Sequence, residues 1–176
     1  MDELKKHNVP VILGPSMQMP SARNDPYDAP YANAARLHEA GIRFCIKAVD
    51  SGPGSATSTR NLPYQAAMAV AYGLPPEEGL KAVTLYPAQI LGVADQLGTI
   101  EVGKLANLVI CDGHLLQPTT EVKALFIAGK PLPPTSKHTQ LYARYQERLK
   151  QVRDGKVMLG VRGTKEAAGK AAGAAN

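Results

Sequence analysis

Gly41-Ile42-Arg43-Phe44-Cys45-Ile46-Lys47-Ala48-Val49-Asp50 is the stretch that decides the fold, together with the loop over residues 51–60 that follows it. Gly41 can end a helix, and the short run of β-branched and apolar residues after it predicts a strand. This strand closes on a carboxylate, Asp50, and the chain then enters a loop rich in Gly, Ser and Thr. In α/β proteins, loops at the carboxyl ends of strands are where catalytic groups usually lie.

Asp50 is therefore the candidate site residue, and it has two interpretations. An Asp between a strand and Ser51-Gly52 is also an ordinary turn residue, whose carboxylate accepts hydrogen bonds from backbone N–H groups. The local sequence favours the turn interpretation over a catalytic one.

A strand, a long connection and a helix precede this stretch. A buried strand is predicted over residues 9–14, a helix over residues 31–40, and the strand over residues 42–49 follows. Two strands joined by a helix form a βαβ unit, which implies parallel pairing and a right-handed crossover. The chain is therefore assigned to the α/β class, and a further helix is predicted over residues 62–72.

The pattern changes after a helix that begins at Pro75. Tyr86-Pro87 is expected to break this helix, with one more short helical turn before Gly92. Strands over residues 106–111 and 121–128 then predict a small β unit. Such a unit is marginally stable alone and needs another sheet to cover it.

The charge and the composition exclude several classes of function. From Ser136 onward the chain has nine Lys and Arg against three Asp and Glu, so the net charge of +5 belongs to this segment. A globular nucleic-acid interface is not predicted, although the segment could attract an acidic surface without specificity. No apolar run reaches the length of a membrane helix, and the first residues lack a signal-peptide core, so a cytoplasmic location is the default expectation. Cys45 and Cys111 are predicted to be buried small hydrophobes and not a disulfide or metal pair.

Three stretches within residues 79–130 match the motifs of one protein family. The stretch Gly79-Leu80-Lys81-Ala82-Val83-Thr84-Leu85-Tyr86-Pro87-Ala88-Gln89-Ile90-Leu91-Gly92 is similar to the family's A-L-K-A-V-T-x-N-P-A-x-x-L-G segment. Leu97-Gly98-Thr99-Ile100-Glu101-Val102-Gly103-Lys104 and the residues to Val109 resemble its L-G-S-L-E-x-G-K-D-A-D-L-V signature. Phe126-Ile127-Ala128-Gly129-Lys130 resembles its V-F-I-x-G-R ending. The three motifs together are specific, and they resemble the amidohydrolase superfamily, the imidazolonepropionase-like group in particular.

The resemblance implies a (β/α)8 barrel with a small β-sandwich built from both chain ends. Members of the family hydrolyse C–N bonds of amides or cyclic amides with one or two divalent metals, zinc being the expected one. An Asp at the end of the last barrel strand contacts the metal and orients the attacking water as general base. Asp50 matches that position, so the resemblance implies a catalytic and metal-binding role for Asp50.

The chain departs from the family pattern at several places. The His-x-His pair of the first barrel strand, the bridging Lys or acid and the later histidines have no counterparts among His7, His38, His114 and His138. Tyr86, Leu105 and Asn107 replace a usual Asn and two common Asp residues. One carboxylate cannot hold a catalytic metal, which needs several ligands, so no metal is expected in this chain alone.

The sequence therefore predicts the carboxyl-terminal part of an amidohydrolase: the last βα units of a (β/α)8 barrel and part of the sandwich. Alone, it is expected to be inactive, and unstable or sticky because its sheet edges are open. The expected partners are the missing amino-terminal barrel half or another copy at these edges, and a small-molecule substrate once the fold is complete. The alternative is a non-catalytic remnant or partner-binding α/β module. The predicted parts are a partial barrel over residues 1–92, sandwich strands over 93–134, a terminal helix over 135–155 and a disordered Ala/Gly/Lys tail over 156–176.

Overall fold

The computed structural model describes residues 1–48 and 55–156. The chain divides into two compact units, Met1–Pro134 and a second one that begins at Thr135, and each is described by itself. Within the described ranges, no helix has both the length and the apolar character that crossing a membrane requires.

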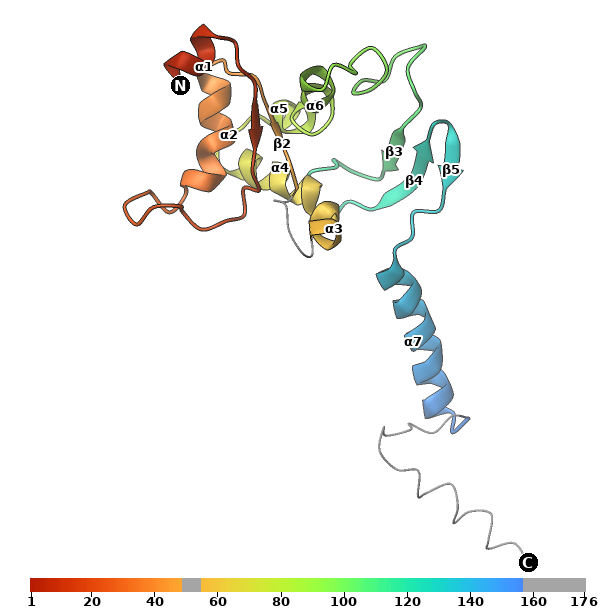
Figure 1. Cartoon of the computed structure of the whole chain (residues 1–176). Helices are drawn as coiled ribbons and strands as arrows, with labels where there is room; N and C mark the ends of the chain where they lie inside the picture. The colour runs from red at the N-terminus through yellow and green to blue at the C-terminus, as the bar shows by residue number, and fades with distance from the viewer. Residues whose placement is uncertain (49–54, 157–176) are drawn as a thin grey trace, which may run out of the picture. The chain divides into compact units, whose positions relative to one another are not determined.

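The first unit contains the expected parallel strand pair (Figure 1). β1 (Val11–Leu13) pairs with β2 (Phe44–Ile46) in parallel, with Ile12 opposite Cys45, and α2 (Ala29–Glu39) connects the two strands. The βαβ prediction is confirmed, but both strands are shorter than predicted. Pairing begins at Val11 because Pro10 has no N–H to donate, and the N–H of Val11 donates to the carbonyl of Arg43 at 2.9 Å.

Helices cover β2 and form the core with it. α4 (Leu62–Ala71) contacts both α2 and β2, and its Ala66 and Ala69 are fully buried. These small side chains let the backbones approach closely, as the run of alanines in this helix predicts. Phe44 in β2 is 1% exposed, and its ring meets Tyr86 edge-on at a centroid distance of 6.3 Å. The α/β class predicted from the sequence is therefore confirmed.

The break predicted at Tyr86-Pro87 lies earlier in the structure, so the helix from Pro75 ends sooner than predicted and the short helical turn before Gly92 begins sooner. α5 (Pro76–Lys81) ends before Thr84, and α6 (Leu85–Ile90) begins after it, so Pro87 lies in the first turn of α6 and not at a break. Proline is accepted there because the first N–H groups of a helix have no intrahelical acceptor. The Thr84 hydroxyl donates to the carbonyl of Leu80 at 2.8 Å, which satisfies an acceptor at the end of α5.

The β unit is a three-stranded antiparallel sheet in the order β3-β4-β5. β3 (Leu108–Cys111), β4 (Val122–Ile127) and β5 (Lys130–Leu132) form it, and β5 had no separate prediction. Ile127 pairs with Lys130 across a two-residue turn in which Ala128 and Gly129 both have positive φ, 49° and 77°. This is the turn that matches the twist of a hairpin. Whether these elements belong to a closed barrel and a sandwich stays a prediction.

Three short helices had no prediction: α1 (Asp2–Lys6), α3 (Ser55–Ser58) and a 3-10 turn at Thr59–Asn61. In the second unit, α7 (Lys137–Arg153) begins with a reciprocal capping box between Ser136 and Thr139. The tail predicted to be disordered lies outside the described residues from position 157 onward.

Candidate functional site

The carboxyl ends of β1 and β2 leave the sheet at one edge because the strands are parallel. β1 leads into Gly14, Pro15 and Ser16, and β2 leads into Lys47 and then toward Asp50. Asp50 itself, the predicted catalytic and metal-binding residue, lies outside the described residues. The site is therefore characterised from its described neighbours.

A buried polar contact fixes the chain where it leaves β1. Ser16 is 6% exposed and Gln65 of α4 is 4% exposed. The Ser16 hydroxyl lies 2.9 Å from both Oε1 and the backbone oxygen of Gln65, and the N–H of Met17 donates to the same Oε1 at 3.0 Å. Because buried polar groups are costly to leave unpaired, this three-way contact holds the start of the β1–α2 loop against α4.

Gln65 was not among the residues that the sequence singled out. A signal for it exists, since Gln65 precedes Ala66 and lies one helical turn before Ala69, two fully buried residues of α4. A polar side chain on such a buried face must find a buried partner. What the sequence does not give is that the partner lies 49 residues away, at the end of β1.

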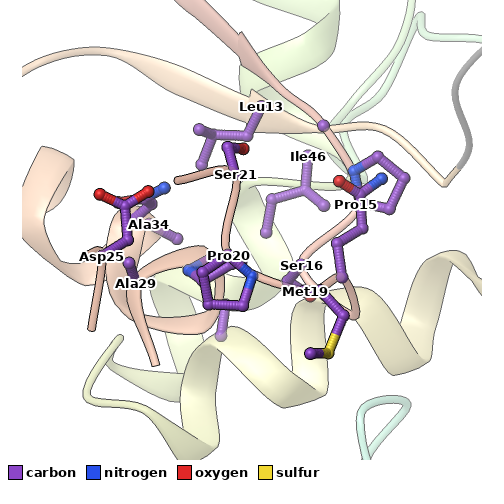
Figure 2. A pocket seen from close by; sticks show the side chains of 15 residues that line it. Leu13, Pro15, Ser16, Met19, Pro20, Ser21, Asp25, Ala29, Ala34 and Ile46 are labelled. Carbon is purple, nitrogen blue, oxygen red and sulfur yellow. The ribbon is translucent and has the colours of Figure 1, made fainter. Parts of the chain in front are cut away.

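A pocket of about 180 Å³ lies beside this contact, beneath the β1–α2 loop. Figure 2 shows Asp25 and Ala29 on one side of it and Ile46 and Pro15 on the other. The sheet and the helices supply apolar walls, and the loop supplies hydroxyl, amide and carboxylate groups. The pocket thus lies between the carboxyl ends of the strands and the helices α2 and α4.

The described residues do not form a metal centre. Across residues 1–48 and 55–156, no three His, Cys, Asp or Glu side chains are grouped so that they could hold a metal ion. Two of the histidines lie near carboxylates, with His7 Nε2 3.3 Å from Glu3 and His38 Nδ1 3.6 Å from Glu78. A catalytic metal, which needs about three protein ligands, is therefore not held by this part of the chain.

Cys45 is not poised to act as a nucleophile. Cys45 is buried in β2, and burial raises the pKa of its thiol, which keeps it protonated and inert. Cys45 is buried as predicted, whereas Cys111 is only partly buried, and neither forms a disulfide.

One cluster of charged and polar side chains in the first unit belongs to the helix layer. Glu78 in α5 accepts hydrogen bonds from Lys81 Nζ at 2.8 Å and from the Tyr86 hydroxyl. These two bonds, the Lys81 bond first, lower the pKa of the Glu78 carboxyl, while burial raises the pKa of the Tyr86 hydroxyl. His38, which faces Glu78, lies in the last turn of α2, the end that leads back to the start of β2. We therefore assign this cluster a structural role.

The turn-rich stretch before β3 is fixed by one glycine and one lysine. Gly98 has a φ of +98°, and a Cβ there would lie 2.9 Å from the Ala88 Cβ, so only glycine fits against α6. Lys104 is mostly buried and donates to the carbonyl of Ala94 at 2.8 Å and to the Thr99 hydroxyl. These contacts give a structural reason for the G and K of the motif.

The chain is similar to proteins of known family. The family model described as "Amidohydrolase family" matches residues 2–132. The chain is similar to the imidazolonepropionase of Symbiobacterium thermophilum, with 38% identity over 84 residues, which are 47% of this chain and 19% of that protein. It is also similar to the N-acetylglucosamine-6-phosphate deacetylase of Caenorhabditis elegans, with 35% identity over 95 residues, 53% of this chain and 21% of that protein.

A solved structure supports the fold. The crystal structure of an amidohydrolase from Thermotoga maritima MSB8 aligns with a TM-score of 0.62 and 29% identity, covering 74% of this chain and 33% of that chain. The chain thus spans about a fifth of the length of the two curated relatives and a third of the solved one.

Proposed function

The chain belongs to the amidohydrolase family, and from this membership we propose that it is the carboxyl-terminal part of a metal-dependent hydrolase acting on C–N bonds. The bonds proposed are those of amides or cyclic amides and not peptide bonds. The names of the two curated relatives, an imidazolonepropionase and an N-acetylglucosamine-6-phosphate deacetylase, make substrates of these two kinds the first to test.

One observation carries the proposal: β1 and β2 are parallel, so they lead into the Ser16 loop and toward Asp50 from the same edge. This is the edge at which barrel enzymes carry their catalytic groups. We assign Asp50 the role of general base, accepting a proton from the water that attacks the carbonyl carbon. The Ser16–Gln65 contact supports the adjoining loop.

The metal of such an enzyme, zinc being the one expected, would polarise the carbonyl and acidify the bound water. The described residues do not supply its ligand set. We therefore propose that the other ligands come from an amino-terminal barrel half, or from another copy of the chain. By itself the chain is proposed to be inactive.

Two open surfaces support a partner of this kind. Ile12 in β1 is 54% exposed, although its neighbours in the strand are partly covered, and β1 has one neighbouring strand among the described elements. An apolar groove of about 510 Å³ runs along β3, an edge strand of the second sheet, and Leu97, Leu105 and Leu108 are among its lining residues. Open edges and apolar grooves are where further strands pair and pack.

A second candidate is a partner-binding module without catalysis. The observation that favours it is the apolar exposure near the groove, where Ile100 is 87% exposed and Val102 fully exposed. Monomeric proteins rarely leave large apolar patches uncovered. In this interpretation the chain binds its partner through the same surfaces, and Asp50 has no catalytic role.

The test compares the chain alone with the chain co-expressed with an amino-terminal amidohydrolase half that contains His-x-His. Bound zinc is measured by elemental analysis, and hydrolysis is measured with imidazolonepropionate and N-acetylglucosamine 6-phosphate. Zinc and turnover in the complex, and neither in the chain alone, are the expected results. A complex that forms without zinc or turnover would replace the hydrolase with the binding module.

A further inference from the structure

The pocket beneath the β1–α2 loop has a definite chemical character. Its apolar walls come from Leu13, Ile46 and Ala69, which belong to β1, β2 and α4. Its polar groups come largely from the loop, where Figure 2 labels Ser21 and Asp25. A ligand would therefore contact apolar side chains of β1, β2 and α4 and polar groups of the loop.

The size of the pocket indicates a subsite. Pockets that enclose a whole drug-sized ligand measure about 300–1,000 Å³, whereas this one measures about 180 Å³. That volume suits the end of a molecule whose remainder lies outside the pocket. The pocket adjoins the carboxyl ends of β1 and β2, where Leu13 and Ile46 line it.

The charge of the pocket is carried by a single carboxylate. Asp25 is the one ionisable side chain among the described residues that line it. Its Oδ2 accepts a hydrogen bond from the N–H of Ala22 at 3.0 Å, and none of the ion pairs between described residues includes it. The described residues that line the pocket thus carry one negative charge and no positive one.

The start of α2, which also borders the pocket, offers little to an anion. A helix start attracts anions through its unpaired N–H groups, but Pro30 has none. The N–H of Ala29 donates to the carbonyl of Pro26 at 3.0 Å, and the N–H groups of Tyr31 and Ala32 donate to that of Asp28 at 3.0 and 2.9 Å. The donors that would bind an anion are therefore already used.

We propose that this pocket is a subsite for the alkylammonium or guanidinium end of the substrate, with the Asp25 carboxylate as its counter-charge. That the ligand is a substrate rests on the proposed hydrolase function, whereas the binding of the cation does not. Charge-assisted hydrogen bonds to the carboxylate would supply affinity, and the hydrophobic walls would accept the alkyl stem. Amides with a basic side group would then be preferred over acidic substrates, which include imidazolonepropionate and N-acetylglucosamine 6-phosphate.

The test is a titration of the ¹⁵N-labelled chain, in which amide resonances are followed by NMR while n-propylammonium or methylguanidinium is added. Saturable shifts at Ser16, Ser21 and Asn33 are expected, and n-propanol and propionate should give none. Asp25→Asn keeps an oxygen for the Ala22 N–H but removes the charge, so it should weaken cation binding about tenfold. Asp28→Asn, which changes a neighbouring carboxylate outside the pocket lining, is the matched control and should bind as the unchanged chain does.

Equal binding of the cations by the Asp25→Asn variant would overturn the proposal, as would a preference for propionate. Shifts that never saturate would mean weak surface attraction only and would also overturn it. Saturable cation binding in a chain whose reconstituted complex hydrolyses neither the two acidic compounds nor an amide with an alkylammonium side group would keep the subsite and reject the hydrolase. Turnover in the complex without cation binding would keep the hydrolase and reject the subsite.

Discussion

Replacing Gln65 should destabilise the chain more than replacing its partner Ser16 does. Gln65→Leu keeps the size of the side chain but removes the acceptor of the Met17 N–H, while the Ser16 hydroxyl keeps the backbone oxygen of position 65 at 2.9 Å. The hydrogen bond of the Met17 N–H is part-buried, so leaving this donor without an acceptor should cost about 1–2 kcal/mol. Ser16→Ala removes a donor but leaves Oε1 of Gln65 bonded to Met17, so it should cost only about 0.5–1.5 kcal/mol.

Urea unfolding followed by far-UV circular dichroism measures both costs, and the slope of the transition should not change. Gln89→Leu, in the exposed part of α6, makes the same replacement without a buried contact and should shift the free energy of unfolding by about 0.5 kcal/mol or less. Hydrogen exchange at Met17 should accelerate in Gln65→Leu. The reasoning fails if Gln65→Leu is no more destabilising than Ser16→Ala, or if exchange at Met17 is unchanged.

Three further predictions concern stability. Gly79→Ala should destabilise the fold by about 1–3 kcal/mol, because the new Cβ would lie 2.6 Å from Val70 Cγ2, and this overlap outweighs the better helix propensity of alanine. Thermal unfolding measures the loss of stability, and a variant more stable than the unchanged chain would contradict the overlap. Folding lowers the pKa of Glu78, so its contribution to stability is complete above the pKa of the unfolded chain, near 4.5, and is lost as the pH falls through the pKa of the folded chain. In Glu78→Gln the free energy of unfolding should therefore change less between about pH 6 and about pH 3, and an unchanged pH dependence would contradict this prediction. Ala128→Gly should leave stability unchanged or raise it by about 1 kcal/mol, because Ala128 has φ +49°, and a clear loss in urea unfolding would contradict this.

The parts of the fold that the sequence predicts are those with local causes. The βαβ unit follows from two apolar runs around one helical pattern, and the close packing of α4 follows from Ala66 and Ala69. The sequence predicts the break at Pro87, because proline usually breaks a helix. The structure has it earlier, between α5 and α6, since a proline in the first turn is compatible with a helix.

The candidate site was less accessible from the sequence. The strand-end position makes Asp50 a candidate, and only the resemblance implies its catalytic role. Asp50 lies outside the described residues, so this role stays a prediction. The Ser16–Gln65 contact and the pocket at Asp25 depend on residues far apart in the chain, which no local pattern brings together. The loop motif, in contrast, is explained locally by Gly98 and Lys104.

The most direct test is to measure the turnover of the reconstituted complex that carries Asp50→Asn and to compare it with the unchanged complex. Asp95→Asn, at an exposed position in the same unit, is the matched control. The account predicts that Asp50→Asn lowers kcat by a factor of about 100 or more, with association of the two halves unchanged, because a general base contributes that much. A complex that turns over equally well with Asp50→Asn and Asp95→Asn would contradict the catalytic role of Asp50.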